Sequence, residues 1–489
     1  MKDLLKWQLI SFGSRGVAMA LGIIQSVVIA RILTVSEYGL VGIVTAIGGV
    51  FGIYQHLGLA SGSTREISAA KEDSEIFKIF VTSVVIRYFI TFPLAIGLFF
   101  AANYLAIDRY GHPELVLPIQ IYAVVLFVQG VQSMFNSVVS GMQRFKTLFV
   151  YQALISFVSV LIYIPFIYFF KVTGYFYALL AFNIIGSLAL GTIALWPIRK
   201  SLVFPSVDDF KRLIREILSI SLAIYFVKIF YTMWQKSGPL LLGIDVSPEL
   251  VGIFSFAMLF SSKIMAVSDA VTDVNLPMLS KKFVSDFEEF RKVFSENFDK
   301  IFSFIVFSAV SAVYWAPELF FIAIGDGRYD RSLEILPPLI FAFILYSLIN
   351  IIKSSILVPA KLVWQMIISY GILLVLTAGF YYFFRESIGH LDAMAYGMAI
   401  GAFVSFLFMN IVAQFEIKFN YFGWDHFLIL LQGIIISISG NIDNLFIKIP
   451  LYLLFSILFA IALFAVKFVT KEQLIEIYSK VSTKFLKAK

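Results

Sequence analysis

Long apolar runs separated by short polar segments recur along the whole chain. Each run is about 20 residues long, the length an α-helix needs to cross the hydrocarbon core of a bilayer. The runs predict helices at 8–31, 38–60, 77–101, 115–140, 148–170, 174–197, 216–242, 249–273, 298–324, 333–358, 362–384, 391–414, 426–441 and 446–468. The pattern therefore predicts an all-α integral membrane protein with about 14 transmembrane helices, or twelve helices and a re-entrant pair.

Composition agrees with this prediction. Of the 489 residues, 60% are hydrophobic and 14% are charged, whereas a soluble domain carries roughly 25% charged residues. The chain has no cysteine, which excludes structural disulfides and thiol-bound metals. We find no phosphate-binding loop, no metal-ligand spacing and no cleavable signal peptide. We therefore expect no cofactor, no nucleic-acid partner and no enzymatic activity.

The placement of lysine and arginine predicts the orientation. With the N-terminus inside, these residues concentrate in alternate segments and in the C-terminal tail, and few occur on the other side. The positive-inside rule then places both termini in the cytoplasm. The two longest inside segments, 198–215 and 274–297, are basic and amphipathic. They are expected to lie on anionic lipid, or to dock a cytoplasmic partner.

An internal repeat divides the chain. Val41-Gly42-Ile43 corresponds to Val251-Gly252-Ile253, and each half has six predicted helices, an even number. The halves therefore cross the membrane in the same sense and are expected to form two lobes around a central cavity. The predicted parts are an N-terminal lobe at 1–197, a cytoplasmic linker at 198–215, a C-terminal lobe at 216–414, an additional helix pair at 415–470 and a basic cytoplasmic tail at 471–489.

Several ionisable residues interrupt the apolar runs. Such groups are costly in a bilayer and usually face a bundle interior or a water-filled cavity. They are Arg15, Arg87, Lys228, Lys236, Lys263, Asp269, Asp273 and Lys353. Arg87 is expected to bind either an interhelical partner or the substrate. Lys353 is expected to reach the interface. Asp269 and Asp273 either pair with a base such as Lys353 or bind a coupling cation.

The excess of cations predicts a positively charged cavity wall. Arg15 lies in the first helix, and Lys228 lies in the equivalent helix of the second half, so we expect the two to face each other. Gln129, Gln132 and Asn136 form a polar stripe at i, i+3 and i+7, which either joins helices or binds polar cargo such as sugars. Positive charge in a cleft attracts anions, and a pyrophosphate or phosphate group would suit it.

The opening of the chain resembles the multidrug/oligosaccharidyl-lipid/polysaccharide (MOP) exporter superfamily, and within it the Wzx-type polysaccharide-repeat flippases. The resemblance rests on Ala30-Arg31-Ile32-Leu33, Ser36-Glu37-Tyr38-Gly39-Leu40, Gly58-Leu59-Ala60 and Arg65-Glu66-Ile67. It implies a fold similar to the multidrug and toxin extrusion (MATE) transporters. It also implies that the chain moves an isoprenoid-pyrophosphate-linked oligosaccharide from the inner to the outer leaflet of a prokaryotic cell membrane. In such flippases cations on the lobe helices line the lumen, and Arg15 and Lys263 could fill that role here.

The implied partners are an undecaprenyl-type lipid-linked glycan, membrane lipids, and a glycan polymerase and glycosyltransferases. Three alternatives stay open. The peptidoglycan-precursor flippases look similar, but their Arg-Asp pair is replaced here by Gln25-Ser26. MATE-type antiporters often carry an acidic residue in the N-terminal lobe, which the first six predicted helices lack. A membrane scaffold for glycan assembly is the third alternative.

Overall fold

The computed structural model describes residues 2–218, 221–266, 268, 269, 279, 282, 283, 285–438, 440, 442 and 444–468, and of residues 2–15, 17 and 221–224 the backbone alone. Throughout these ranges the regular structure is helical and no strand occurs. The chain divides into two units. The first comprises 1–257, 326–332 and 370–397, and the second comprises 258–325, 333–369 and 398–489.

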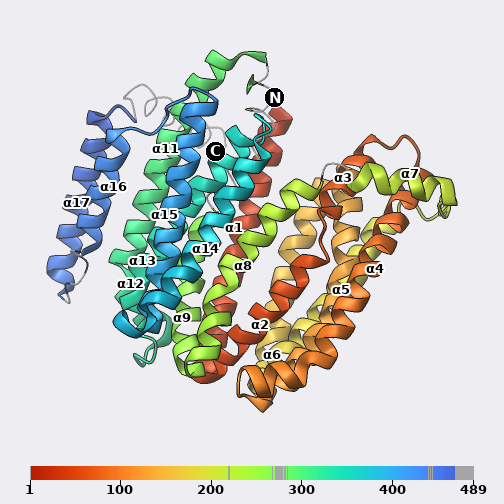
Figure 1. Ribbon diagram of the computed structural model, residues 1–489, viewed down its shortest axis with the longest axis horizontal. Helices are drawn as coiled ribbons and strands as arrows, with labels where there is room; N and C mark the ends of the chain where they lie inside the picture. The colour runs from red at the N-terminus through yellow and green to blue at the C-terminus, as the bar shows by residue number, and fades with distance from the viewer. Residues whose placement is uncertain are drawn as a thin grey trace, which may run out of the picture. The chain divides into compact units, whose positions relative to one another are not determined.

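The elements follow one another with short connections (Figure 1). Mainly in the first unit are α1 (Lys2–Ile32), α2 (Val35–Tyr54), α3 (Leu59–Ala69), α4 (Asp73–Asn103), the π-helix η1 (Tyr104–Arg109), the 3₁₀ turn η2 (Pro113–Leu115), α5 (Val116–Gly141), α6 (Phe145–Leu195), α7 (Val207–Leu218), α8 (Ser221–Asp245), α9 (Pro248–Ser261) and α14 (Val363–Ile388). Mainly in the second are the 3₁₀ turn η3 (Ser262–Ile264), α11 (Phe287–Tyr314), α12 (Ala316–Ile324), α13 (Ser332–Ile352), the π-helix η4 (Lys353–Leu357), α15 (His390–Glu416), α16 (Trp424–Ile438) and α17 (Leu445–Ala465).

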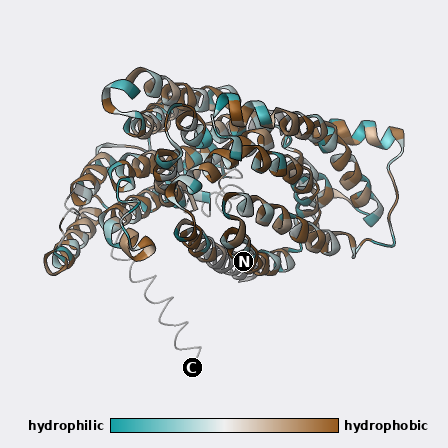
Figure 2. Ribbon diagram, turned by 90° about the horizontal axis from the view of Figure 1, so that it is seen from below, coloured by the Kyte–Doolittle hydropathy of each residue, from teal (hydrophilic) through white to brown (hydrophobic). Residues whose placement is uncertain are grey.

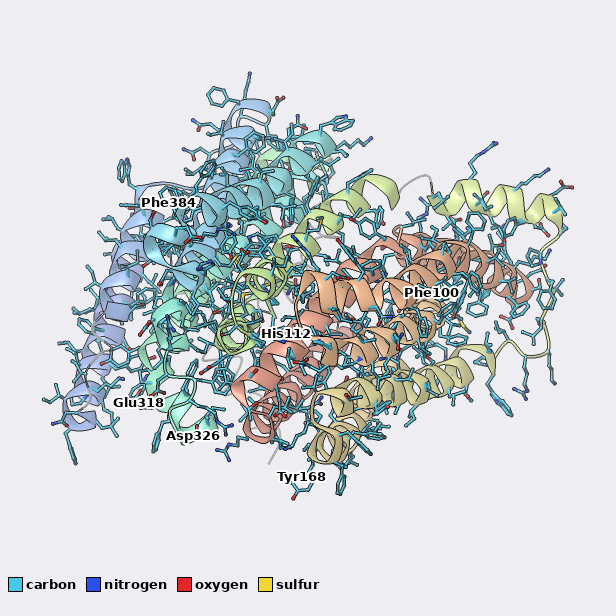
Figure 3. The ribbon with its side chains drawn as sticks, turned by 60° about the horizontal axis from the view of Figure 1, so that its bottom comes forward. Phe100, His112, Tyr168, Glu318, Asp326 and Phe384 are labelled. Carbon is cyan, nitrogen blue, oxygen red and sulfur yellow. The ribbon has the colours of Figure 1, made fainter. Side chains whose placement is uncertain are left out.

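The all-α membrane fold is confirmed. Within the described ranges, nine helices are long and apolar enough to cross a bilayer, and the shorter segments Ala18–Ile32 and Trp424–Ser437 are also apolar. Apolar residues extend along most of the helix lengths in Figure 2. Phe100 and Tyr168 are 76% and 64% exposed, and Tyr168 points away from its helix in Figure 3, as expected of lipid-facing side chains. The total of fourteen spans stays a prediction.

Two predicted helices are interrupted in the structure. The helix predicted at 38–60 ends at Tyr54, because Leu57 and Gly58 take left-handed backbone conformations (φ 39° and 70°) before α3 begins. The helix predicted at 298–324 breaks at Trp315, because Pro317 in the first turn of α12 has no N–H to donate to the preceding turn. The helices predicted at 148–170 and 174–197 are both present, because α6 consists of two helices separated by the non-helical Lys171 (φ 52°, ψ −126°).

In the first unit, α2 and α9 cross at their N-terminal ends, and glycine makes the crossing possible. A Cβ at Gly39 would lie 1.8 Å from the Pro248 carbonyl oxygen, and a Cβ at Gly252 would lie 2.0 Å from the Val35 carbonyl oxygen. Any side chain at either position would therefore force the helices apart. The contact is reciprocal, and it joins the two segments that the internal repeat relates.

The first unit also positions the amphipathic segment that was predicted at 198–215. Helix α7 packs on α3 and α4, and it buries Leu213 and Ile217 there. At its N-terminal end, Lys78 of α4 donates a hydrogen bond to Asp209 over 2.9 Å. This bond holds the pKa of the Asp209 carboxyl down at about 2. At the right edge of Figure 2, α7 alternates hydrophilic and hydrophobic residues, as expected of a helix with one buried face.

Candidate functional site

A polar cavity of about 490 Å³ lies within the first unit. Helices α4, α5, α6 and α8 contribute most of its wall, and the segment between α2 and α3 and the start of α3 contribute the rest. Its lining residues are His56, Ala60, Arg87, Gln129, Gln132, Ser133, Asn136, Tyr151, Gln152, Asn183, Leu190 and Lys228. Ten of these twelve side chains are polar, in a unit whose helices are otherwise largely apolar.

Arg87 is the buried cation of this cavity. Its side chain is 0% exposed. One terminal nitrogen, Nη1, donates a hydrogen bond to Ser133 Oγ over 3.0 Å, and Nη1 and Nη2 lie 3.4 and 3.5 Å from His56 Nδ1. Arginine has no acceptor, so His56 must accept through an unprotonated Nδ1. The third nitrogen, Nε, is buried without a hydrogen-bond partner in the described part of the chain. Arg87 is thus held between helices by neutral groups.

Lys228 on α8 brings a second cation to the same cavity. Its side chain is solvent-exposed along the cavity wall, and the described residues offer it no hydrogen bond and no carboxylate. None of the twelve lining residues is Asp or Glu. Two positive charges therefore share a polar cavity without a balancing acid among its lining residues, which is an arrangement that attracts anions.

Neutral amide side chains form a second polar feature of the cavity wall, beside the two cations. Gln129, Gln132 and Asn136 all line the cavity, so the stripe predicted on this helix faces one polar space. Gln132 Nε2 donates to the Tyr151 hydroxyl over 3.3 Å, and that hydroxyl donates to the Gly186 carbonyl over 3.0 Å. Part of the stripe thus also joins α5 to α6. The structure is therefore compatible with both interpretations of the stripe, joining helices and binding polar cargo.

Sequence reasoning missed five polar members of the wall: His56, Ser133, Tyr151, Gln152 and Asn183. Ser133 follows Gln129 by one helical turn, and the spacing alone could have found it. Gln152 and Asn183 are amides inside apolar runs, which is a readable signal of a buried polar face. Tyr151 carries no such signal, because tyrosine is common in membrane helices for other reasons.

The other predicted cations do not line this cavity. Lys236 lies on α8, where its side chain packs against α2, with Cε 3.0 Å from the position of a Cβ at Gly49. Lys263 lies in η3, which belongs to the second unit. The side chain of Arg15 lies outside the described residues, so the expected Arg15–Lys228 arrangement stays a prediction.

Of the two predicted acids, Asp269 is described and Asp273 lies outside the described residues. In the second unit, Asn350 Nδ2 donates to Asp269 Oδ1 over 3.1 Å, and Lys353 Nζ donates to Asn350 Oδ1 over 2.6 Å. One amide therefore bridges the acid and the lysine. This network supports the structural interpretation of Asp269 over cation coupling, although its role stays a prediction.

Comparison with solved structures places the fold. An inward-facing multidrug resistance MATE transporter of the MOP superfamily matches with a TM-score of 0.69 at 16% identity, over 84% of this chain and 99% of that one. The lipid II flippase MurJ, in an inward closed conformation, matches with a TM-score of 0.70 at 14% identity, over 93% and 98%. A MATE transporter in complex with MaL6 gives a TM-score of 0.59 at 15% identity, over 85% and 97%. At such identities the likeness shows the fold.

The search of curated proteins returns no match. The sequence profile described as "Polysaccharide biosynthesis protein", by contrast, matches residues 4–283, which is more than half of the chain. This match covers the opening motifs and every lining residue of the polar cavity. The chain therefore belongs to the polysaccharide biosynthesis protein family and is a multi-pass membrane protein that shares its fold with MATE transporters and with the lipid II flippase MurJ.

Proposed function

We propose that this transporter flips an isoprenoid-pyrophosphate-linked oligosaccharide from the cytoplasmic to the outer leaflet by alternating access. The observation that carries the proposal is the polar cavity of the first unit, with Arg87 and Lys228 and no acid among its lining residues. A pyrophosphate is a compact anion, and cations in a low-dielectric cleft bind it well. The lipid II flippase with a similar fold moves a lipid-linked cargo, as its name states.

The two chemical features of the cavity suit the two polar parts of such a cargo. Arg87 keeps Nε without a partner, and Lys228 has all three of its N–H donors available to an anion. The amides of Gln129, Asn136 and Asn183 offer both donors and acceptors, which is what sugar hydroxyls require. The isoprenoid chain would stay in the bilayer, because its transfer into a polar cavity is unfavourable.

The same cavity argues against the alternatives. A cation-coupled antiporter that exports cationic drugs needs an acidic group in its binding cavity, and none lines this one. In the peptidoglycan-precursor branch, Gln25-Ser26 would be an Arg-Asp pair. Here Gln25 Oε1 accepts a hydrogen bond from Ser159 over 2.6 Å, which uses the side chain to join α1 to α6. We place the protein in the prokaryotic cell membrane with both termini cytoplasmic, beside a glycan polymerase and glycosyltransferases.

Reconstituted vesicles provide the test. A fluorescent isoprenoid-pyrophosphate glycan is incorporated, and its arrival in the outer leaflet is followed with a membrane-impermeant quencher. We expect Arg87→Ala and Lys228→Ala each to slow translocation by about tenfold or more. Each variant removes a charge contact to the cargo, and a loss of about 1.4 kcal/mol corresponds to a factor of ten. Lys211→Ala is the matched control, since Lys211 lies exposed on α7.

The outcomes separate the proposals. Unchanged translocation in both cavity variants would show that these cations do not bind the cargo. The absence of translocation by the parent protein would favour the scaffold alternative. Drug export by the parent that is lost in Asp269→Asn would favour the antiporter instead.

A further inference from the structure

A second cavity, of about 390 Å³, lies in the first unit where the two ends of α6 meet. Its lining residues are Arg144, Thr147, Thr192, Ile193, Trp196 and Pro197. The first two lie at the start of α6, and the others lie at its end or just beyond it. None of them lines the polar cavity described above. The predicted orientation places these helix ends on the cytoplasmic side of the membrane.

Arg144 gives this second cavity its chemistry. The half-buried guanidinium donates one hydrogen bond, from Nη1 to the Ile193 carbonyl over 3.2 Å, which ties the two ends of α6 together. Arginine carries five N–H donors, and the described residues provide no other acceptor for this one. The hydroxyl of Thr147 also has no hydrogen-bond partner among the described residues. The cavity therefore presents unused donors beside a fixed positive charge.

The chain segments that line this cavity add positive charge and contain no acid. The Arg199 guanidinium stacks over the Trp196 ring at 4.2 Å from its centroid, and it donates to the Trp196 carbonyl over 2.8 Å. Lys146 and Lys200 are exposed at the same helix ends. Residues 115–207 contain no Asp or Glu at all. The local charge therefore favours an anion.

Apolar surface continues from the cavity along both halves of α6. Leu154 lies two turns beyond Thr147 on the same helix face and is 61% exposed. Leu188 lies one turn before Thr192 and is 68% exposed. Trp196 is 62% exposed at the rim, and tryptophan is enriched at the level of the lipid headgroups. A ligand in this cavity would meet cations and hydroxyls at one end and aliphatic surface at the other.

We propose that this second cavity binds the phosphate of an anionic phospholipid from the cytoplasmic leaflet. Arg144 and the Thr147 hydroxyl would hold the phosphate oxygens, and the acyl chains would lie along the exposed leucines of α6. Basic pockets between membrane helices on the cytoplasmic side bind lipid headgroups in this manner. The aliphatic surface beside the cavity favours a phospholipid over a free phosphate ion.

Native mass spectrometry of the full chain in detergent tests the site, with phosphatidylglycerol, phosphatidylcholine and inorganic phosphate as separate probes. We expect Arg144→Ala to weaken phosphatidylglycerol binding by about tenfold or more and to leave phosphatidylcholine binding unchanged. Arg109→Ala is the matched control, because Arg109 is an exposed arginine in η1 at the other end of the predicted span. It should bind phosphatidylglycerol as the parent does.

Arg144→Ala also removes the bond to Ile193, so two gentler variants accompany it. Thr147→Val keeps the side-chain shape and removes an unused hydroxyl, and Arg144→Lys keeps the charge. Both should fold with the parent's thermal midpoint and bind phosphatidylglycerol more weakly. If all three variants bound phosphatidylglycerol as tightly as the parent protein does, the proposal would be overturned. Displacement of phosphatidylglycerol by inorganic phosphate at comparable concentration would also overturn it, because the site would then recognise a free anion.

Discussion

Arg87 in the first unit and Lys448 in the second are both buried cations in apolar helices, but their partners differ. Lys448 of α17 is 1% exposed, and its Nζ lies 2.6 and 2.8 Å from the two carboxylate oxygens of Glu318, which Figure 3 labels on α12. The Tyr314 and Trp315 rings flank the ammonium at 5.3 and 5.6 Å. Arg87 has a serine and a histidine instead.

The difference separates a structural charge from one that can serve a ligand. Burying an ion is costly, and a carboxylate with good geometry offsets that cost within the protein. The Lys448–Glu318 pair is neutral as a unit, and it joins α17 to α12. Arg87 borders a polar cavity of about 490 Å³, so a bound anion can supply the charge that the protein omits. The variants below change the Lys448–Glu318 pair, Arg87 and its neighbour, or an ion pair nearer the surface.

The largest effect is expected from Glu318→Gln. This change leaves Lys448 buried without its counter-charge, and the free energy of unfolding should fall by about 3 kcal/mol. Thermal unfolding in detergent, followed by tryptophan fluorescence, measures the loss. Adding Lys448→Met to Glu318→Gln should restore most of the stability, because the pair is removed as a whole. A double variant as unstable as Glu318→Gln would show that the ion pair is not the cause.

Ser133→Asp would give Arg87 the acid that it lacks. Ser133 Oγ already lies 3.0 Å from Arg87 Nη1, so the new carboxylate should pair with the guanidinium and stabilise the fold by about 1 kcal/mol. The same pairing should compete with an anionic cargo and slow vesicle translocation by about tenfold or more. Ser133→Asn has a similar shape without the charge and should retain more activity. Full activity in Ser133→Asp would show that transport does not require an Arg87 without a carboxylate partner.

Arg87→Met should change stability little. The arginine bonds neutral groups alone, and removal of a buried charge offsets the loss of those bonds, so we expect a change within about 1 kcal/mol. Translocation should still fail. Thermal unfolding and translocation are measured on one preparation. A loss of stability as large as that of Glu318→Gln would mean that Arg87 is a structural cation like Lys448.

The two cations also show what sequence reasoning can reach. The intramembrane position of Arg87 and the amide stripe on α5 can be predicted from the sequence, because ionisable and polar residues are conspicuous in apolar runs. The stripe and Arg87 do line one cavity. The pairing of Lys448 cannot be found in the sequence, because its partner Glu318 is 130 positions away and no local pattern relates them.

The helices could also be predicted from the local pattern of apolar residues, but the breaks within them could not. An average of hydropathy over about 20 residues finds a span but smooths over a turn of two or three residues. The turn at Leu57 and Gly58 and the break at Trp315 both fell inside predicted helices. Cavity members such as Tyr151 depend on how α6 packs on α5, which is a property of the tertiary fold.

The smallest effect is expected at the Lys78–Asp209 pair, whose side chains are only half-buried at the surface, so that water replaces much of what either partner provides. Hydrogen bonding to Lys78 lowers the pKa of Asp209 to about 2. A lowered carboxyl pKa adds stability above the unfolded value of about 4, and this stability is lost as the pH falls toward about 2. Lys78→Ala should therefore flatten the dependence of the thermal midpoint on pH between about 5 and 2.

Asp209→Asn should flatten this dependence equally, because it removes the titrating group itself, whereas Lys211→Ala should leave the parent curve unchanged. An acid dependence that persists in both Lys78→Ala and Asp209→Asn would assign it to other carboxyls. Because water reaches this pair, even its complete loss should move the midpoint far less than Glu318→Gln does. The order of the two effects would show that burial, rather than the presence of an ion pair, determines how strongly this fold depends on a charge.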